Sequence, residues 1–163
     1  MFCRTYLDTP FGLWALEGSE RGLRTVRLVP SFSELPEAPV PEPLREAVRQ
    51  LEEYFRRERQ VFDLPLDLWD APAFYRSVWD LLREVPYGRT TSYSSIAHRL
   101  GKPGAVRAVG QANAGNPLAI VIPCHRCLAK SGDLRGYFYG LDMKRALLAW
   151  ENPAAYAQQG GLF

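Results

Sequence analysis

An apolar run in the second half of the chain stops at a proline, and a cysteine and a histidine follow at once. Residues 120–122 are Ile-Val-Ile, and Pro123, Cys124, His125 and Arg126 come next. A short run of β-branched apolar residues is typical of a buried strand. Because proline interrupts the hydrogen bonding of a strand, we expect the strand to end here and Cys124 to lie just beyond it.

Cys124 is a candidate nucleophile. A free cysteine reacts as its thiolate and is mostly protonated at neutral pH, because its pKa is about 8.5. A neighbouring imidazole, a guanidinium or a helix N-terminus lowers that pKa, and the sequence offers candidates for all three. Free cysteines are also among the most buried residue types, so a structural cysteine is the alternative. The chain has 3 cysteines, an odd number that argues against a secreted disulfide framework and favours a reducing compartment, the cytoplasm.

Charge divides the chain into an acidic first part and a basic second part. Residues 1–71 hold 9 Arg against 13 Asp and Glu, a net charge of −4. Residues 72–163 hold 11 Lys and Arg against 5 Asp and Glu, a net charge of +6. A basic half that contains Cys124 suggests a polyanionic partner, nucleic acid first, although clustered surface charge gives the same count. No apolar run reaches the ~20 residues of a transmembrane helix, and the N-terminus lacks the apolar core of a signal peptide.

The first part of the chain is predicted to combine strands with one helix. Residues 4–8 and 23–29 alternate apolar and polar side chains as half-buried strands do. Three glycines, at positions 12, 18 and 22, are predicted to form turns. A helix is expected over residues 44–60, because apolar residues recur there at three- and four-residue steps. The sequence Asp70-Ala71-Pro72 then marks a boundary between domains 1–71 and 72–163.

The second part is predicted to be mostly helical. Two short helices, over residues 92–100 and 105–114, are separated by a Gly/Pro turn and have the spacing of a helix-turn-helix. The second of them carries small residues at most positions, with Arg107 and Asn113 as polar arms. Such a helix can closely approach another backbone, which would be either protein or DNA.

Several motifs together resemble those of the O6-alkylguanine-DNA alkyltransferases. The motif around Cys124 begins at Gly115-Asn116-Pro117 and continues through Ile122-Pro123-Cys124-His125-Arg126. The other matching segments are Val85-Pro86-Tyr87-Gly88, Thr91-Ser92-Tyr93, Arg107-Ala108-Val109-Gly110, Ser131-Gly132, Gly136-Tyr137, Gly140-Leu141, Lys144 and Leu147-Leu148-Ala149-Trp150-Glu151. The resemblance implies an α/β (α+β) N-terminal domain with a small antiparallel sheet. After this domain, it implies a mostly helical, winged-helix-like C-terminal domain that contains a helix-turn-helix.

The resemblance also implies direct-reversal DNA repair. Cys124 would take an alkyl group, methyl above all, from O6 of guanine in one irreversible transfer; O4 of thymine is left open as a second substrate. His125 would deprotonate Cys124 through a water, and Glu151 would orient and stabilise that histidine. Asn116 would brace the turn before the cysteine, and Tyr93 would donate a proton or hydrogen bond to the departing guanine.

The implied partner is double-stranded DNA that contains O6-alkylguanine, with the damaged base flipped out to reach the thiol. The small-residue helix would lie in the minor groove with Arg107 in the vacated stack; a phosphate contact or a surface salt bridge is the alternative for Arg107. The residues predicted to contact DNA are Ser92, Arg107, Ala108, Gly110, Asn113 and Arg126. The residues predicted to line the substrate pocket are Cys127, Tyr137, Phe138, Tyr139 and Lys144. A monomer without a cofactor or membrane attachment is expected.

The sequence departs from the family pattern at three places near the site. Asn113 stands where some relatives carry an apolar residue beneath the base, so weaker packing against the base is expected. Cys127 stands where valine is usual and creates a CxxC spacing with Cys124, which raises the hypothesis of a disulfide that silences the protein under oxidation. Phe138 and Tyr139 add bulk where small residues are common, so methyl groups should be accepted more readily than benzyl groups. Zinc, which some relatives bind in the N-terminal domain, is not expected, because Cys3 is the only Cys or His there.

Three other functions remain as alternatives. A non-enzymatic sensor of alkylated guanine resembles this fold, but sensors replace the reactive cysteine that is present here. A dithiol oxidoreductase would use the CxxC spacing, yet the alkyltransferase motifs extend over some eighty residues around it. A cysteine hydrolase needs an acyl-thioester that water can attack, whereas a thioether formed by alkyl transfer has no such exit.

Overall fold

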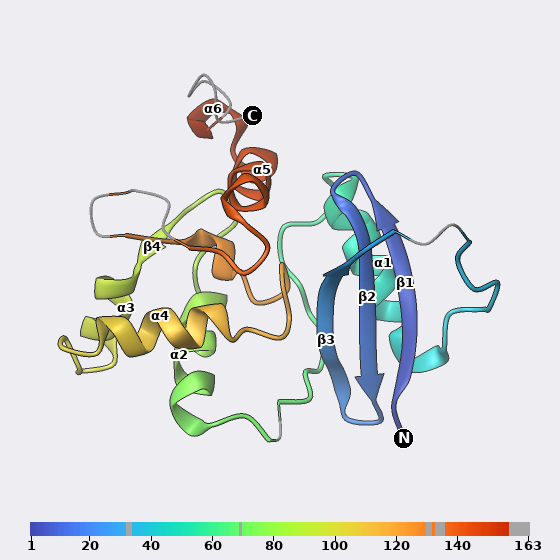
Figure 1. The fold of residues 1–163 in the computed structure, drawn as a ribbon, viewed down its shortest axis with the longest axis horizontal. Coiled ribbons are helices and arrows are strands. Elements are labelled where there is room, and N and C mark those ends of the chain that lie inside the picture. The colour runs from blue at the N-terminus through green and yellow to red at the C-terminus, as the bar shows by residue number, and fades with distance from the viewer. Residues whose placement is uncertain (32–33, 69, 130–131, 133–135, 157–163) are drawn as a thin grey trace. The chain divides into compact units, whose positions relative to one another are not determined.

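The computed structural model divides the chain into two compact units, Met1–Trp69 and Asp70–Phe163 (Figure 1). It describes residues 1–156 apart from 32–33, 69, 130–131 and 133–135. The boundary predicted between residues 71 and 72 lies slightly further along the chain. Within the described ranges, no helix is long and apolar enough to cross a membrane.

The first unit contains a three-stranded antiparallel sheet whose strands follow chain order. They are β1 (Cys3–Thr9), β2 (Gly12–Ser19) and β3 (Gly22–Val29). Tight turns join them, since Thr9 pairs with Gly12 across the first turn and Ser19 with Gly22 across the second. The small antiparallel sheet predicted for this domain is therefore confirmed.

The central strand β2 was not predicted, and the turn placed at Gly18 was wrong. Gly18 lies inside β2 and adjoins an irregularity in its pairing with β3. Gly12 and Gly22 each follow a tight turn as the first residue of their strand, as expected. The strand escaped notice because residues 13–16 are all buried, so apolar side chains do not alternate with polar ones. Gly18 is needed for close packing, since a Cβ atom there would lie 2.7 Å from Leu44.

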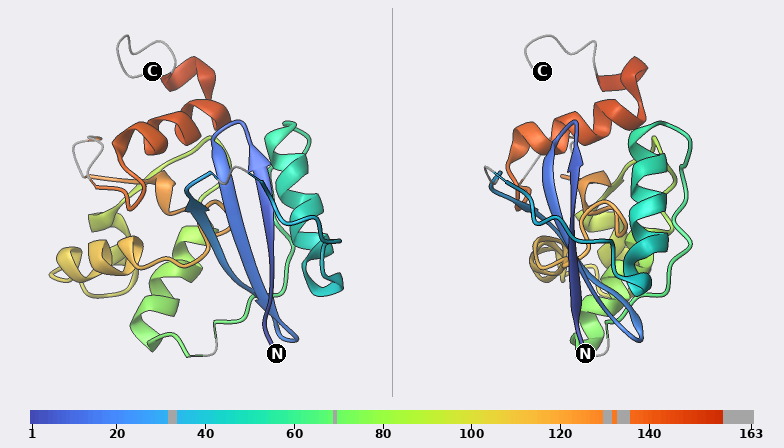
Figure 2. Two further views of the ribbon diagram at one scale, coloured as in Figure 1. Left: turned by 45° about the vertical axis from the view of Figure 1, so that its right-hand side comes forward. Right: turned by 90° about the vertical axis from the view of Figure 1, so that its right-hand side faces the viewer.

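One helix packs beside the sheet (Figure 2). The 3₁₀ helix η1 (Glu42–Leu44) leads directly into α1 (Arg45–Phe55), and both contact the sheet. The buried face of α1 carries Ala47, Val48, Leu51, Tyr54 and Phe55. The predicted helix extended to residue 60, but α1 ends earlier because Arg57 adopts a left-handed conformation with φ 62°.

The second unit is mostly helical, as predicted. Its helices are α2 (Ala73–Arg83), α3 (Tyr93–Arg99), α4 (Val106–Ala114), α5 (Leu141–Glu151) and the short α6 (Pro153–Tyr156). Helices α3 and α4 form the two-helix unit expected from the sequence, and both contact α2. The indole nitrogen of Trp79 ties α2 to α4 with a 2.8 Å hydrogen bond to the Ala112 carbonyl. Two short strands, β4 (Thr91–Ser92) and β5 (Cys127–Leu128), pair in parallel.

The strand predicted before Pro123 is wrong. Residues 118–122 are buried, but they form a compact turn in which the Ile122 amide donates to the Leu118 carbonyl at 2.9 Å. Ile120 has φ 72°, an unfavourable conformation for a β-branched residue. The side chain of Asn116 supplies hydrogen bonds to the backbone of this turn that a neighbouring strand would otherwise provide. Burial alone therefore explains the apolar run.

Candidate active site

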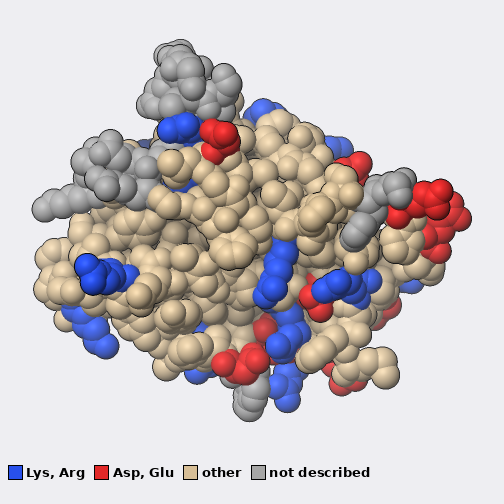
Figure 3. Space-filling view, viewed as in Figure 1, with Lys and Arg blue, Asp and Glu red and all other residues tan. Residues whose placement is uncertain are grey.

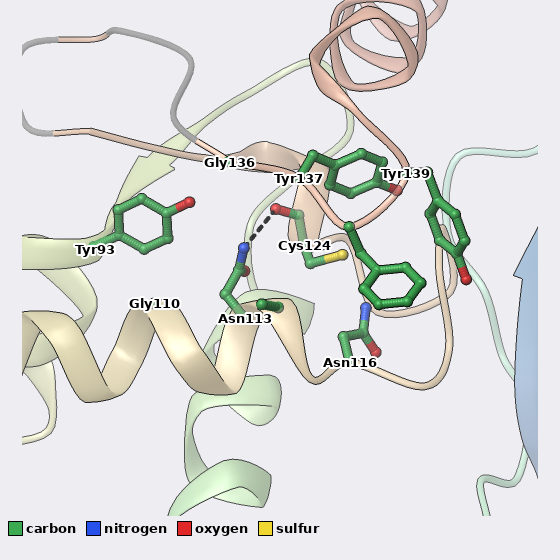
Figure 4. A pocket seen from close by; sticks show the side chains of 10 residues that line it. Tyr93, Gly110, Asn113, Asn116, Cys124, Gly136, Tyr137 and Tyr139 are labelled. Carbon is green, nitrogen blue, oxygen red and sulfur yellow. Dashed lines mark hydrogen bonds between the residues drawn. The ribbon is translucent and has the colours of Figure 1, made fainter.

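A cavity of about 270 Å³ opens in the second unit (Figure 4). Its walls come from the start of α3, from α4, from the 3₁₀ helix η2 (Cys124–Arg126) and from the segment before α5. The lining residues are Tyr93, Gly110, Asn113, Ala114, Asn116, Cys124, Gly136, Tyr137, Phe138 and Tyr139. Figure 4 shows the sulfur of Cys124 within this ring of side chains. The candidate nucleophile therefore lies in a pocket that is mainly apolar and aromatic.

Cys124 is held in place by the loop before it. The Asn116 amide donates to the Ile122 carbonyl at 2.7 Å and accepts from the Leu118 backbone nitrogen at 2.9 Å. These bonds fix the turn that leads into Cys124.

The environment of Cys124 disfavours its thiolate. Cys124 is only 5% exposed. Burial raises the pKa of Cys124, while the Asn116 amide and the positive charge of Lys144 act in the opposite direction. The thiol thus stays protonated at neutral pH and needs a base to react.

A buried histidine–glutamate pair lies beside the cysteine in the sequence. His125 Nε2 and Glu151 Oε2 are 2.8 Å apart, and both side chains are fully buried. Burial lowers the pKa of His125, although Glu151 counteracts it. Burial would raise the pKa of Glu151, but His125 and Arg126 outweigh it and hold this pKa well below its usual range. A neutral imidazole therefore faces a carboxylate.

This pairing fixes the proton on the histidine. A carboxylate can only accept, so Nε2 of a neutral His125 must carry the hydrogen. Nδ1 is then a lone-pair acceptor, and it is buried without a hydrogen-bonding partner in the described part of the chain. An imidazole in this tautomer, oriented by a carboxylate, is arranged as a general base.

Arg126, which was predicted to contact DNA, belongs instead to this buried cluster. Its Nε donates to Glu151 Oε1 at 2.8 Å, its Nη2 to Oε2 at 3.0 Å, and its Nη1 to the Val85 carbonyl at 2.7 Å. The residue is 5% exposed, so its guanidinium is not available to a phosphate. We therefore correct that prediction, because Arg126 supports the carboxylate that orients His125.

Cys127 and Lys144 are also displaced from their predicted place. Both are fully buried, and neither lines the cavity. The Lys144 ammonium donates to the Cys127 carbonyl at 2.6 Å and to the Gly136 carbonyl at 3.2 Å, behind the pocket wall. Burial raises the pKa of Cys127 to about 12, and both thiols of the CxxC are free. A redox dithiol needs an activated thiolate, so this environment argues against an oxidoreductase.

The sequence matches two models of one protein family over nearly its whole length. Residues 1–68 match the ribonuclease-like domain of 6-O-methylguanine DNA methyltransferase, and residues 73–153 match its DNA binding domain. The chain belongs to the 6-O-methylguanine DNA methyltransferase family. The resemblance inferred from the motifs is therefore confirmed.

Individual members of the family agree with this assignment. The chain is 47% identical over 150 residues to the methylated-DNA–protein-cysteine methyltransferase of Mycolicibacterium paratuberculosis, and the match covers 89% of each protein. The fold is similar to the crystal structure of the Mycobacterium tuberculosis O6-methylguanine methyltransferase, with a TM-score of 0.81, 40% identity and 94% of each chain covered. It is also similar to M. tuberculosis OGT in complex with DNA, with a TM-score of 0.79, 42% identity and 91% of each chain covered.

Three residues predicted to contact DNA lie on or beside the two-helix unit of this methyltransferase fold. Arg107 is exposed on α4 and makes no hydrogen bond or ion pair with other described residues, and Ala108 is adjacent to it. Ser92 caps α3, because its hydroxyl accepts from the Ser95 backbone nitrogen at 3.0 Å. On the face shown in Figure 3, the region of α3 and α4 is mostly uncharged, with isolated Lys and Arg side chains.

Gly110 and Asn113 differ from that group because they line the cavity. Asn113 is 4% exposed, so the prediction that it contacts the DNA surface is corrected to a place in the pocket wall. Tyr93 lies across the same pocket, and burial raises its pKa to about 12. Its hydroxyl is thus a neutral hydrogen-bond donor at physiological pH.

Two wall residues and one backbone atom were missed by the sequence analysis. Ala114 and Gly136 line the cavity, although both stood in segments that had been singled out for small residues or for motif matches. The Val85 carbonyl accepts from Arg126, and no side-chain pattern can reveal a backbone partner of that kind. Within the described ranges, no group of three or more His, Cys, Asp or Glu residues could hold a metal ion.

Proposed function

We infer that this chain repairs alkylated DNA by moving one alkyl group, methyl above all, from O6 of guanine to Cys124. The observation that carries this inference is the position of Cys124 in a cavity, with His125, the next residue in the chain, buried against the Glu151 carboxylate. If O4-alkylthymine is a second substrate, its alkyl group goes to the same Cys124 thiol. The names of the similar proteins support the same activity.

The steps follow from the protonation states of the site. His125 Nδ1 takes the thiol proton by way of a water, and Glu151 stabilises the imidazolium that results. The thiolate attacks the alkyl carbon, so the C–S bond forms as the C–O bond breaks. The electron pair of the C–O bond stays with guanine, whose anion takes a proton from solvent at N1, while the His125 imidazolium returns its proton to solvent. Tyr93 donates a hydrogen bond to the departing base. The thioether has no route back to a thiol, so each molecule reacts once.

Access to the cavity requires a flipped nucleotide, because the thiol is recessed. Small residues on α4, among them Ala108 and Gly110, would let this helix approach the minor groove closely. Arg107 projects from the same helix and would fill the gap that the base leaves. Ser92, at the start of α3, would contact the DNA backbone.

Every residue assigned a role belongs to one unit of one chain, so we propose that a monomer suffices. The nucleophile must also remain reduced, and Cys3, Cys124 and Cys127 are all free. The cytoplasm keeps thiols reduced, which supports that location.

The proposal is tested by following the bases of a duplex that contains one O6-methylguanine. We expect wild-type protein to convert the modified base to guanine, with one conversion per protein molecule. Cys124→Ser should bind the duplex and convert nothing. Tight binding by the wild type without any conversion would instead support a sensor, and conversion of many bases per molecule would point to an enzyme that turns over.

A further inference from the structure

Asn113 is the buried polar residue of the pocket to which the proposed reaction gives no role. It projects from α4 and lines the same cavity as Cys124. Its Nδ2 donates to the backbone carbonyl of Cys124 at 3.3 Å, whereas its Oδ1 is buried without a hydrogen-bonding partner in the described part of the chain. Figure 4 shows the amide group of Asn113 between Tyr93 and Cys124, at the wall of the pocket.

The carbonyl of Cys124 sets the orientation of this amide. A carbonyl oxygen can only accept, so the NH₂ end of Asn113 must face it. The other end is therefore an acceptor held in a mainly apolar wall. Buried acceptors without a partner are uncommon in folded proteins, and leaving one unpaired costs free energy that a donor on a bound ligand would recover.

The chemistry of the substrate indicates which group could supply that donor. An alkyl group on O6 leaves N1 of guanine without a hydrogen, so the exocyclic N2 amino group is the only N–H donor of the damaged base. We propose that Asn113 Oδ1 accepts a hydrogen bond from this amino group and thereby selects alkylated guanine over bases that lack it. Tyr93 complements this contact, because its neutral hydroxyl can donate to the ring nitrogen next to the amino group.

This inference rests on the proposed function and narrows its substrate. O6-methylhypoxanthine matches O6-methylguanine except that the amino group is missing. O4-methylthymine likewise offers no N–H donor. Asn113 would therefore disfavour both bases relative to O6-methylguanine. Because a neutral hydrogen bond is modest in strength, the preference should be about three- to tenfold.

The test compares single-turnover rates of methyl transfer from two duplexes that differ only in this amino group. The wild type should react about three- to tenfold faster with O6-methylguanine than with O6-methylhypoxanthine. In Asn113→Leu and Asn113→Ala, the ratio of the two rates should fall to about one. A ratio taken within one preparation is insensitive to any loss of folded protein.

Gln111→Leu is the matched control, because Gln111 is an exposed amide on the same helix and does not line the cavity. It should keep the wild-type ratio. A wild-type ratio near one, or an unchanged ratio in the Asn113 variants, would overturn the proposal. So would two Asn113 variants that react with neither duplex while Gln111→Leu reacts, because Asn113 would then serve transfer itself. A wild type that reacts with neither duplex would contradict the proposed function instead.

Discussion

His125 Nε2 lies 2.8 Å from Glu151 Oε2, and neither side chain has exposed surface. The pair does two things at once. It fixes which ring nitrogen of His125 is free to accept a proton, and it compensates the buried charge of Arg126, which contacts the same carboxylate.

Glu151→Gln should therefore impair both chemistry and folding. The amide cannot stabilise an imidazolium as a carboxylate does, so the rate of methyl transfer should fall about a hundredfold or more. Arg126 would keep a buried, uncompensated charge, which should lower the free energy of unfolding by about 3 kcal/mol. Single-turnover kinetics and urea denaturation measure the two effects.

Glu84→Gln is the matched control for that variant. Glu84 pairs with Arg99 at the same distance of 2.8 Å, but both side chains are more than half exposed. Exposed pairs contribute little to stability, so rate and urea midpoint should stay at wild-type values. Equal losses in the two variants would contradict the role given to Glu151.

Acid should destabilise the protein through the same pair. The folded-state pKa of His125 is lowered, chiefly by burial, and that of Glu151 is lowered by His125 and Arg126 against the effect of burial. Both groups bind fewer protons folded than unfolded, so their stabilisation is complete above pH 6.5. It declines once pH falls below the unfolded pKa values, about 6.5 for histidine and about 4.3 for glutamate, and is lost as pH falls on toward the lowered folded values. Urea midpoints at pH 7.5, 5.5 and 4 should decline in that order, and a constant or rising midpoint would count against this account.

Arg107→Ala separates base flipping from chemistry. The side chain is exposed and makes no hydrogen bond or ion pair with other described residues, so its loss should leave the urea midpoint unchanged. Transfer from a duplex should slow about tenfold or more, because an extruded base would no longer be replaced in the stack. Transfer from free O6-methylguanine nucleoside should proceed at the wild-type rate. Equal slowing with both substrates would assign Arg107 a role inside the pocket.

Phe138 should limit the size of the alkyl group. The residue lines the cavity and is 75% exposed, and its ring packs edge-on against Tyr139 with the ring centroids 5.0 Å apart. Wild-type protein should transfer methyl faster than benzyl, and Phe138→Ala should raise the benzyl rate about tenfold while the methyl rate changes little. Phe2→Ala, at another exposed phenylalanine, is the control and should change neither rate. Equal methyl and benzyl rates in the wild type would remove the basis for this prediction.

The sequence predicted the candidate site better than the local structure around it. Motifs identified Cys124, His125, Asn116 and Tyr93, and the structure brings Cys124, Asn116 and Tyr93 to one cavity, while His125 is buried against Glu151. Periodicity found α1 because this helix has one buried face. It missed β2, which is buried on both faces, and it mistook the loop before Pro123 for a strand.

The errors at Arg126 and Lys144 share a physical cause. Arg126 was predicted to contact DNA and Lys144 to line the pocket, because a cation is expected to face solvent or a ligand, and only the fold reveals acceptors for a buried one. For Arg126 these are Glu151, 25 positions away in the chain, and the Val85 carbonyl. For Lys144 they are two backbone carbonyls, which carry no signature in the sequence.

The most direct test of the account is the mass of the protein and of its peptides after incubation with a duplex that contains O6-methylguanine. We expect the mass of each molecule to increase by one methyl group, carried entirely by the peptide that contains Cys124. No mass increase, or a methyl group on the peptide of Cys3 or on Cys127, would contradict the assignment of Cys124 as the nucleophile.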